Sequence, residues 1–465
     1  MFDLLGVFFA FVVVAILLLL SVYIKQKVKF LQKLYLPESI IAGAIALLLG
    51  GEILGKIALQ FDSTSSIVNG IFPAAMQQIW LQCPGVFINV VFASLFLGEN
   101  IPSPQDIWRK ASPQVAFGQS LAWGQYVFGI IIVSFILIPL FDIDPLAATL
   151  IEIGFEGGHG TAAGMAGVLD KLGFPEGGSI ALGLATVGII TGIIGGTWLI
   201  QWGEKQGHVR QNRIETLLLE IPTVDSKNTS VLANLGIDVL SFNCGFTAVA
   251  IAFGWLILKG LFWLETVSWG KNGLELVNAV PLFPMALIGG IILQVIATKL
   301  GIERLIDRQI QERIGGVAID LVIVTAIAGI DLTILGNNLE VFIVLSLVGI
   351  IWNIFAFVVI APRIIPVHWF ERGIGDMGQS MGVTATGILL IRMVDPDNQT
   401  AAFESFAYKQ LFFEPIVGGG LFTAAAPVLI VQFGSMSVLL LTSILLIFWL
   451  VFGVVNFNKI KQGKE

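Results

Sequence analysis

The amino-acid sequence predicts an all-α polytopic membrane protein with two inverted-topology repeats, each of about five transmembrane helices and one re-entrant hairpin, plus one extra C-terminal helix. Of its 465 residues, 56% are hydrophobic and only 12% are charged. The mean hydropathy is +0.90. One aqueous core could not bury so much apolar side chain. The 52 glycines also fit close helix packing and helix breaks at membrane depth.

Apolar runs of about 20 residues, the length that crosses the bilayer core as a helix, recur between short polar clusters. We expect spans near 3–24, 39–58, 83–99, 119–141, 179–202, 236–263, 280–299, 315–334, 341–361, 411–432 and 436–456. Two further stretches, 146–169 and 376–394, contain glycine, polar and charged residues that a lipid-facing helix would not tolerate. These two stretches are predicted to be re-entrant hairpins, which enter and leave the membrane on the same side.

The distribution of lysine and arginine predicts the orientation. With the N-terminus outside, basic clusters at 25–33, 205–227, 299–313 and 459–464 all become cytoplasmic. The first apolar run is followed by lysines and has no basic segment before it, so it is predicted to be a retained span and not a signal peptide. The C-terminus is then cytoplasmic.

A polar linker divides the chain into halves with the same order of features. We expect an N-terminal repeat at 1–202, a cytoplasmic linker at 203–234, a C-terminal repeat at 235–432, and an extra helix with a basic tail at 433–465. The glycine- and threonine-rich segment 157–164 has its counterpart at 378–387. Many secondary transporters build a midplane binding site from inverted repeats with broken helices.

The first hairpin carries one group of candidate site residues. Its glycines allow a sharp reversal of the backbone, and the free N–H groups of the returning helix can bind a carboxylate. The hydroxyl of Thr161 suits sodium. His159 either donates a hydrogen bond to the substrate or holds the loop by one. A buried glycine-rich turn without a binding role is the alternative. The group is Glu156, Gly157, Gly158, His159, Gly160 and Thr161.

The second hairpin carries the other group, with Arg392 as its most conspicuous cation. Arg392 either binds a substrate carboxylate, or extends to the lipid headgroups or pairs locally with Asp395. Asp320, inside an apolar span, must face protein or water, and is either a cation or proton partner or part of a structural hydrogen bond. Weak sodium ligands would be Thr161, Asp320 and Ser380. The remaining candidates are Asp376, Gly378, Gln379, Gly382, Thr384 and Thr386.

Other chemistries are poorly supported by the sequence. The two cysteines and three histidines show no metal-ligand spacing, so no cofactor is expected beyond a coupling ion. The segment Gly373-Ile-Gly-Asp376 matches the GxGD pattern of intramembrane aspartyl proteases, but the chain lacks the YD partner. We therefore do not expect an enzyme.

At the residues of both hairpins the chain resembles the bacterial glutamate:sodium symporter family. The similarity also includes Leu36-Pro37-Glu38, Phe92-Ala93-Ser94 and the segment 181–196, and it extends over nearly the whole chain up to about residue 432. It implies that the oppositely oriented hairpins meet at the substrate and that sodium drives uptake. It also implies an elevator mechanism and a homodimer.

The resemblance predicts sodium-coupled uptake of glutamate across a bacterial inner membrane, with no nucleic-acid partner. Well-known members have a serine where this chain has Glu156, and a histidine where it has Asp376. Two added carboxylates would repel an anion unless a cation or proton binds beside them. Sodium- or proton-coupled symport of another dicarboxylate or a hydroxy acid is therefore the alternative, ahead of a channel or protease.

Overall fold

The computed structural model describes residues 3–33, 36–61, 67–101, 103–209, 238–272, 276–277 and 280–461. Within these residues the regular structure is helical, apart from one isolated bridge between Gly50 and Gly70. The all-α prediction is therefore confirmed. Most of the linker predicted at 203–234 lies outside the described residues.

The first half contains a long N-terminal helix, four further helical segments, a broken hairpin and a closing helix. Its elements are α1 (Leu4–Lys27), α2 (Lys29–Lys33), α3 (Glu38–Leu49), α4 (Lys56–Phe61), α5 (Ala74–Ser94), α6 (Pro104–Ile132), α7 (Ile138–Phe141), α8 (Gly158–Lys171) and α9 (Gly177–Gln206). Short π-helical turns join α3 to α4 and α6 to α7. The descending arm of the first hairpin, residues 145–156, consists of a 3₁₀ turn and a π turn.

The second half follows a similar order of elements, and the inverted relation between the halves stays a prediction. Its elements are α11 (Val239–Val267), α12 (Leu282–Leu300), α13 (Arg308–Ala328), α14 (Leu332–Asn337), α15 (Leu339–Phe355), α16 (Ala361–Ile364), α17 (Trp369–Val394), α18 (Ala402–Phe413), α19 (Leu421–Phe433) and α20 (Ser435–Lys461). The second hairpin is α17, which begins at Trp369 and therefore earlier than the predicted residue 376.

Seven segments within the described residues are long and apolar enough to cross a membrane, which makes this a multi-pass membrane protein. They are Leu4–Lys27, Ala111–Phe141, Gly177–Gln206, Val239–Val267, Leu282–Leu300, Leu339–Ile364 and Ser435–Ile460. Helices α1, α11 and α20 leave large apolar side chains exposed, among them Leu19, Trp263 and Leu440. Lipid tails suit such an apolar surface, because the backbone polar groups between the first and last turns of these helices are bonded internally.

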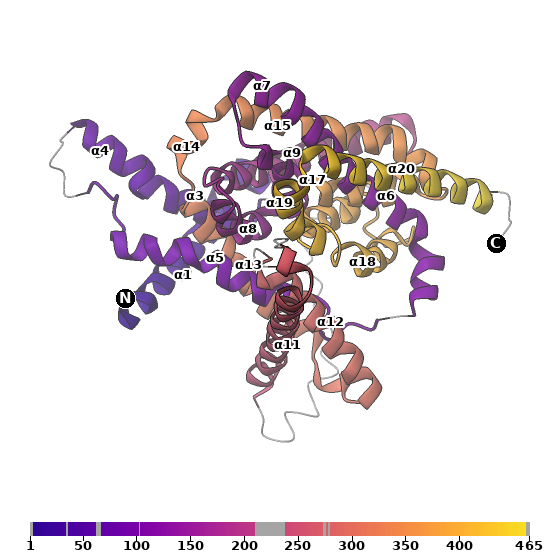
Figure 1. Cartoon of the computed structure of the whole chain (residues 1–465), viewed down its shortest axis with the longest axis horizontal. Coiled ribbons are helices and arrows are strands. Elements are labelled where there is room, and N and C mark those ends of the chain that lie inside the picture. The colour runs from indigo at the N-terminus through magenta and orange to yellow at the C-terminus, as the bar shows by residue number, and fades with distance from the viewer. Residues whose placement is uncertain are drawn as a thin grey trace.

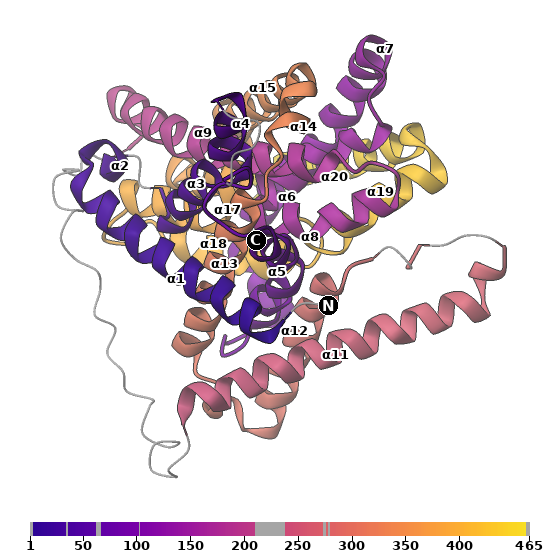
Figure 2. The same cartoon turned by 90° about the vertical axis from the view of Figure 1, so that its left-hand side faces the viewer.

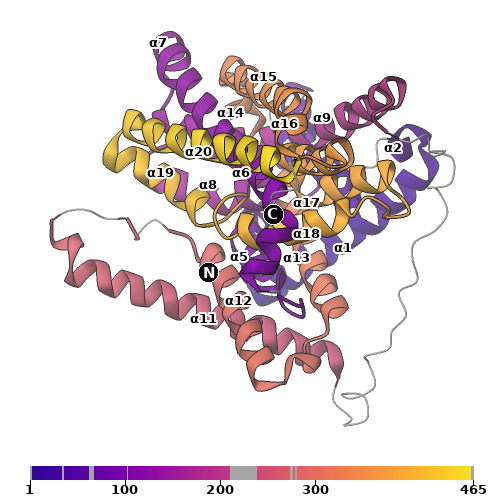
Figure 3. The ribbon, with the colours of Figure 1, turned by 90° about the vertical axis from the view of Figure 1, so that its right-hand side faces the viewer.

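The helices surround the two hairpins. Helices α5 and α13 pack together, with α3 against α13, and α17 packs along α9, α6 and α18. In Figure 1 the helices α1, α3 and α5 lie on one side of α8 and α17, while α6 and α20 lie on the other. Figures 2 and 3 show the long helix α11 along the edge of the molecule. The hairpins are therefore enclosed by protein, as irregular backbone at membrane depth requires.

The span predicted at 411–432 is not one continuous helix. Helix α18 ends at Phe413 and α19 begins at Leu421, with an irregular loop at 414–420 between them. Gly418 and Gly419 have φ of 71° and 103°, in the left-handed region that favours glycine. The loop contains Pro415, which cannot donate a helical hydrogen bond. The chain thus has a third helix break, which the continuous-span prediction missed.

Close packing of α11 on α12 provides a test of the fold. A Cβ at Gly254 would lie 2.5 Å from the backbone nitrogen of Ala286, whereas one at Gly260 would have no neighbour within 4 Å. We expect Gly254→Ala to destabilise the protein by about 1–3 kcal/mol, because backbone cannot move aside as a side chain can. The control Gly260→Ala, on the same helix, should change stability by less than about 0.5 kcal/mol. Thermal unfolding in detergent measures both, and equal midpoints would contradict this packing.

Candidate functional site

The first hairpin reverses at Gly157 and Gly158. The π turn at 152–156 ends when the Gly157 amide donates to the carbonyl of Glu152 over 2.9 Å. Gly158 then adopts φ of 66°, and α8 begins. A Cβ at Gly158 would lie 2.1 Å from Cγ1 of Val383 in the other hairpin. Glycine is thus required here both for its conformation and for the contact between the two tips.

The second hairpin reverses at Gly382 and Val383, where the backbone leaves the helical region inside α17. Its two arms lie against each other, since a Cβ at Gly378 would come within 3.0 Å of Cα of Gly387. Val383 has φ of 65°, which is rare for a β-branched residue and has to be held by its surroundings. The two predicted hairpins therefore have their tips in contact.

Hydrogen bonds connect the tips to each other and to α6. The hydroxyl of Ser380 donates to Oε2 of Glu156, which joins a candidate from each hairpin. The side-chain amide of Gln125 donates to the carbonyl oxygen of Ser380 over 2.7 Å and to its hydroxyl over 3.0 Å. Both Glu156 and Ser380 are buried. The structure thus brings these two predicted residues together.

Glu152 fastens the 414–420 loop to the first hairpin. Its Oε1 accepts hydrogen bonds from the amide of Gly418 over 2.8 Å and from the hydroxyl of Thr423 over 2.7 Å. Its Oε2 accepts one from the hydroxyl of Tyr126 over 2.6 Å. Three donors therefore surround this fully buried carboxylate. Through it the 414–420 loop lies against the break of the first hairpin.

Glu414, at the start of the same loop, belongs to the second tip. Its Oε1 accepts from the amide of Gln379 and from the hydroxyl of Thr384, each over 3.1 Å. The amide of Gln410 donates to the hydroxyl of Thr384 over 3.3 Å. Sequence reasoning missed Glu414 and Gln410, although the nearby triplet Gly418 to Gly420 was a signal of irregular backbone.

Asp376 has a partner from within the chain, Lys409, which sequence reasoning also missed. The Lys409 ammonium lies 3.1 Å from Oδ1 of Asp376 and donates to Oε1 of Gln379 over 2.7 Å. It is 4.0 Å from the ring centroid of Phe413. Oδ2 of Asp376 accepts from the amide of Gln114 over 2.7 Å. Both oxygens of Asp376 are therefore engaged within the protein.

Other predicted site residues lie elsewhere. Arg392 is exposed on the second arm and does not line the cavity, while Asp395 accepts hydrogen bonds from Gln399 and Thr400. Asp320 also lies outside the cavity lining, although its neighbour Ile319 belongs to it. Thr386 donates to the carbonyl of Gly382 and thereby closes the second tip. A direct contact with a ligand in the cavity is therefore not supported for Arg392 or Asp320.

A cavity of about 210 Å³ lies where the tips meet. Its apolar wall comes from α5 and α13, and its polar wall from the hairpins and the 414–420 loop. The polar side is lined by Glu156, Gly157, His159, Gly160, Thr384, Glu414 and Gly418, and the apolar side includes Ile88, Phe92, Ile319 and Ile323.

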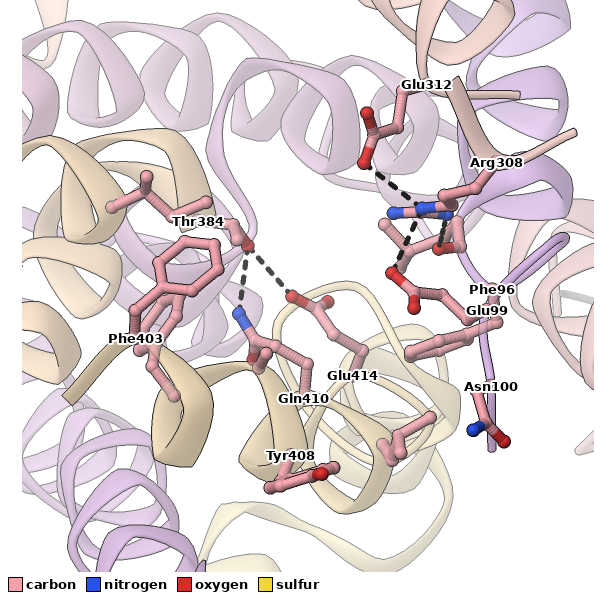
Figure 4. Close-up of a pocket in the computed structure, with 15 residues that line it drawn as sticks. Phe96, Glu99, Asn100, Arg308, Glu312, Thr384, Phe403, Tyr408, Gln410 and Glu414 are labelled. Atoms are coloured by element: carbon pink, nitrogen blue, oxygen red, sulfur yellow. Dashed lines mark hydrogen bonds and ion pairs between the residues drawn. The ribbon is translucent and has the colours of Figure 1, made fainter. Parts of the chain in front are cut away.

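A second cavity of about 300 Å³ adjoins the first, because Leu95, Thr384 and Glu414 line both. Figure 4 shows Thr384, Gln410 and Glu414 on one side of it and Arg308 on the other. The Arg308 guanidinium pairs with Glu99 at 3.0 Å and Glu312 at 3.1 Å. These residues were not predicted, and they mark the far wall of the second cavity.

Two broken hairpins whose tips meet at a cavity with one polar and one apolar wall, in a multi-pass membrane protein, define the class of secondary transporters. The sequence model of the sodium/glutamate symporter family matches residues 4–394, a region that contains both hairpins. The chain therefore belongs to the sodium/glutamate symporter family. This is a family of transporters, and the suspected resemblance is confirmed. A search of curated proteins finds no match.

The contact between the tips can be tested at Gly158. We expect Gly158→Ala to abolish sodium-driven uptake, because the new Cβ would overlap Val383 and would strain a left-handed backbone. Gly167→Ala, in the same helix α8, is the matched control, since a Cβ there has no neighbour within 4 Å. Uptake into liposomes and elution from a sizing column would be measured for both. Normal uptake by Gly158→Ala would contradict the tip contact.

The pair of Asp376 and Lys409 can be tested by a double-mutant cycle. Removing one member of a buried pair leaves the other charge uncompensated, so Asp376→Asn and Lys409→Met should each destabilise the protein by about 3–5 kcal/mol. The double variant should be more stable than either single variant, because no unpaired charge remains. Thermal unfolding in detergent gives the three values. Additive losses would show that the two residues do not interact.

Proposed function

We propose that the cavity between the hairpin tips is the substrate site of a sodium-coupled glutamate transporter that works by alternating access. The meeting of the two tips at this cavity is the observation that carries the proposal. The first N–H groups of α8 have no partner within their own helix and can bind an anion with help from the helix dipole. Gly157, His159 and Gly160, at this helix start, line the cavity and suit a substrate carboxylate.

Sodium finds suitable ligands beside this cavity. The hydroxyl of Thr161 is buried and has no hydrogen-bond partner. A Cβ at Gly419 would lie 2.6 Å from this Thr161 hydroxyl, so the hydroxyl faces the irregular 414–420 loop. Irregular backbone exposes carbonyl oxygens, and such oxygens with a hydroxyl are the ligands that hard cations prefer. We assign Thr161 to the coupling ion, with Ser380 less directly involved because its hydroxyl donates to Glu156.

The cavity beside Arg308 would be the cytoplasmic route to the site. Lysine and arginine cluster in residues 299–313, which the positive-inside rule assigns to the cytoplasm. The second cavity reaches from this region to Thr384 and Glu414. The chain would therefore be in an inward-facing state, with its N-terminus outside and its C-terminus in the cytoplasm of a bacterial cell. A homodimer in the inner membrane, as the family resemblance implies, completes the proposal.

The proposal is tested with purified protein in liposomes. We expect labelled L-glutamate to accumulate when sodium is imposed outside, and to leak out when an ionophore dissipates the sodium gradient. Replacing sodium by potassium or choline is the control for nonspecific leakage. Uptake that saturates and depends on sodium would support a transporter over a channel, whereas gradient-independent equilibration of glutamate would contradict coupled transport.

A further inference from the structure

We propose that Lys409 is a built-in counter-cation of the two hairpins, whose charge allows the empty carrier to return after it has released its substrate and sodium. The inference rests on the proposed function, since it assumes transport by alternating access. It goes beyond an ion pair with Asp376 that only stabilises the fold, because it assigns the Lys409 charge to one step of the transport cycle.

Lys409 differs from the other cationic side chains in its burial. Among the side chains that the structure describes, it is the only lysine or arginine that is buried, and it is 1% exposed. Its ammonium lies 3.1 Å from Oδ1 of Asp376 and donates to Oε1 of Gln379 over 2.7 Å. The ring centroids of Phe406 and Phe413 lie 5.0 Å and 4.0 Å from it. Oxygen atoms and aromatic faces together make this a site for a cation.

Helix α6 leaves room for the Lys409 side chain. A Cβ at Gly118 would lie 2.8 Å from Cδ of Lys409 and 3.2 Å from its Nζ. Gly118 lies in the interior of α6, where glycine is an unfavourable residue for the helix itself. The missing side chain therefore has a use in tertiary packing, which is to let the ammonium lie beside the second hairpin.

The Lys409 charge reaches further than Asp376. Gln379 accepts from Lys409 at Oε1, and its side-chain nitrogen donates to Oε1 of Glu414 over 3.1 Å. The Lys409 charge acts on Glu414 and on Glu156, both of which line the cavity between the tips. One ammonium group thus acts on three buried carboxylates, one from each hairpin and one from the loop after α18.

These carboxylates lose other cations when the carrier is empty. In the loaded carrier, sodium would neutralise part of their charge, and it leaves together with the substrate. A buried carboxylate without a compensating cation is costly, and so is the movement of net charge through the membrane field. Lys409 is bonded to the second hairpin through Gln379, so it stays beside the carboxylates in both orientations. Its charge therefore matters most in the empty return step, in which no bound cation is present.

Exchange and net uptake separate the two halves of the transport cycle. In exchange, labelled glutamate outside replaces unlabelled glutamate inside the liposome, so only the loaded carrier has to cross. Net uptake into glutamate-free liposomes also needs the empty carrier to return. The ratio of the two rates does not depend on how much protein is folded, and it therefore reports on the return step alone.

The informative variant combines Asp376→Asn with Lys409→Met, because it leaves neither partner of the pair unpaired. We expect its net uptake to fall at least about tenfold relative to its exchange, since Glu156 and Glu414 lose the ammonium that acts on them. Lys259→Met, at an exposed lysine of α11, is the matched control and should keep the wild-type ratio. An unchanged ratio in the double variant would overturn the inference and leave sodium-coupled transport intact.

A measurement without substrate separates the inference from the proposed function. Cys244 is exposed on α11, which packs on α12 and α5, and Asn458 is exposed on α20, which packs on α6. With Asn458→Cys, a fluorescent pair on these two positions reports the position of the hairpin unit by energy transfer. In buffer without sodium or substrate, we expect the wild-type protein to alternate between two states.

The double variant should alternate at least about tenfold more slowly under these conditions. Equal rates in the two proteins would overturn the inference whether or not glutamate is transported, and so would a wild-type protein that stays in one state. If the rates differ as expected but glutamate is not accumulated, the assigned substrate is wrong and the role of Lys409 stands.

Discussion

The structure depends on one constraint, that a backbone group freed by a helix break inside a membrane must find a partner within the protein. This chain breaks its helices at Gly157–Gly158, at Gly382–Val383 and at residues 414–420. It satisfies the constraint by bringing all three breaks together. Glu152 binds the amide of Gly418, and Ser380 joins the second tip to the first. The hydrogen bonds at the site therefore also stabilise the broken helices.

The buried charged side chains near the tips fall into two groups. Asp376 and Lys409 neutralise each other behind the second tip, where Gln114 and Gln379 complete their hydrogen bonds. Glu156 and Glu414 instead line the cavity, and the Lys409 charge acts on both of them. The neutral pair stabilises the second hairpin, whereas the excess negative charge lies where ligands enter.

The hairpin tips could be predicted because their signal is local. Glycines next to polar residues in an apolar stretch mark broken helices, and the turns at Gly158 and Gly382 lie within the predicted ranges. Lys409 and Glu414 could not be found in this way. The triplet Gly418 to Gly420 indicates irregular backbone after them, but their own segment mixes charged with aromatic residues, as an interfacial helix would. Only the fold carries Lys409 to Asp376, and it leaves Arg392, the more conspicuous cation, exposed.

The polarity of the cavity walls bears on how the hairpins move. The tips make their hydrogen bonds with α6, α9, α18 and the 414–420 loop. Toward α5 and α13 the cavity presents Ile88, Phe92, Ile319 and Ile323. Sliding along an apolar wall breaks no hydrogen bonds, whereas separating the tips from the 414–420 loop would leave buried polar groups unpaired. The hairpins, that loop and the helices α6, α9 and α18 that bond to the tips are therefore expected to move as one unit past α5 and α13, which is the motion that an elevator mechanism requires.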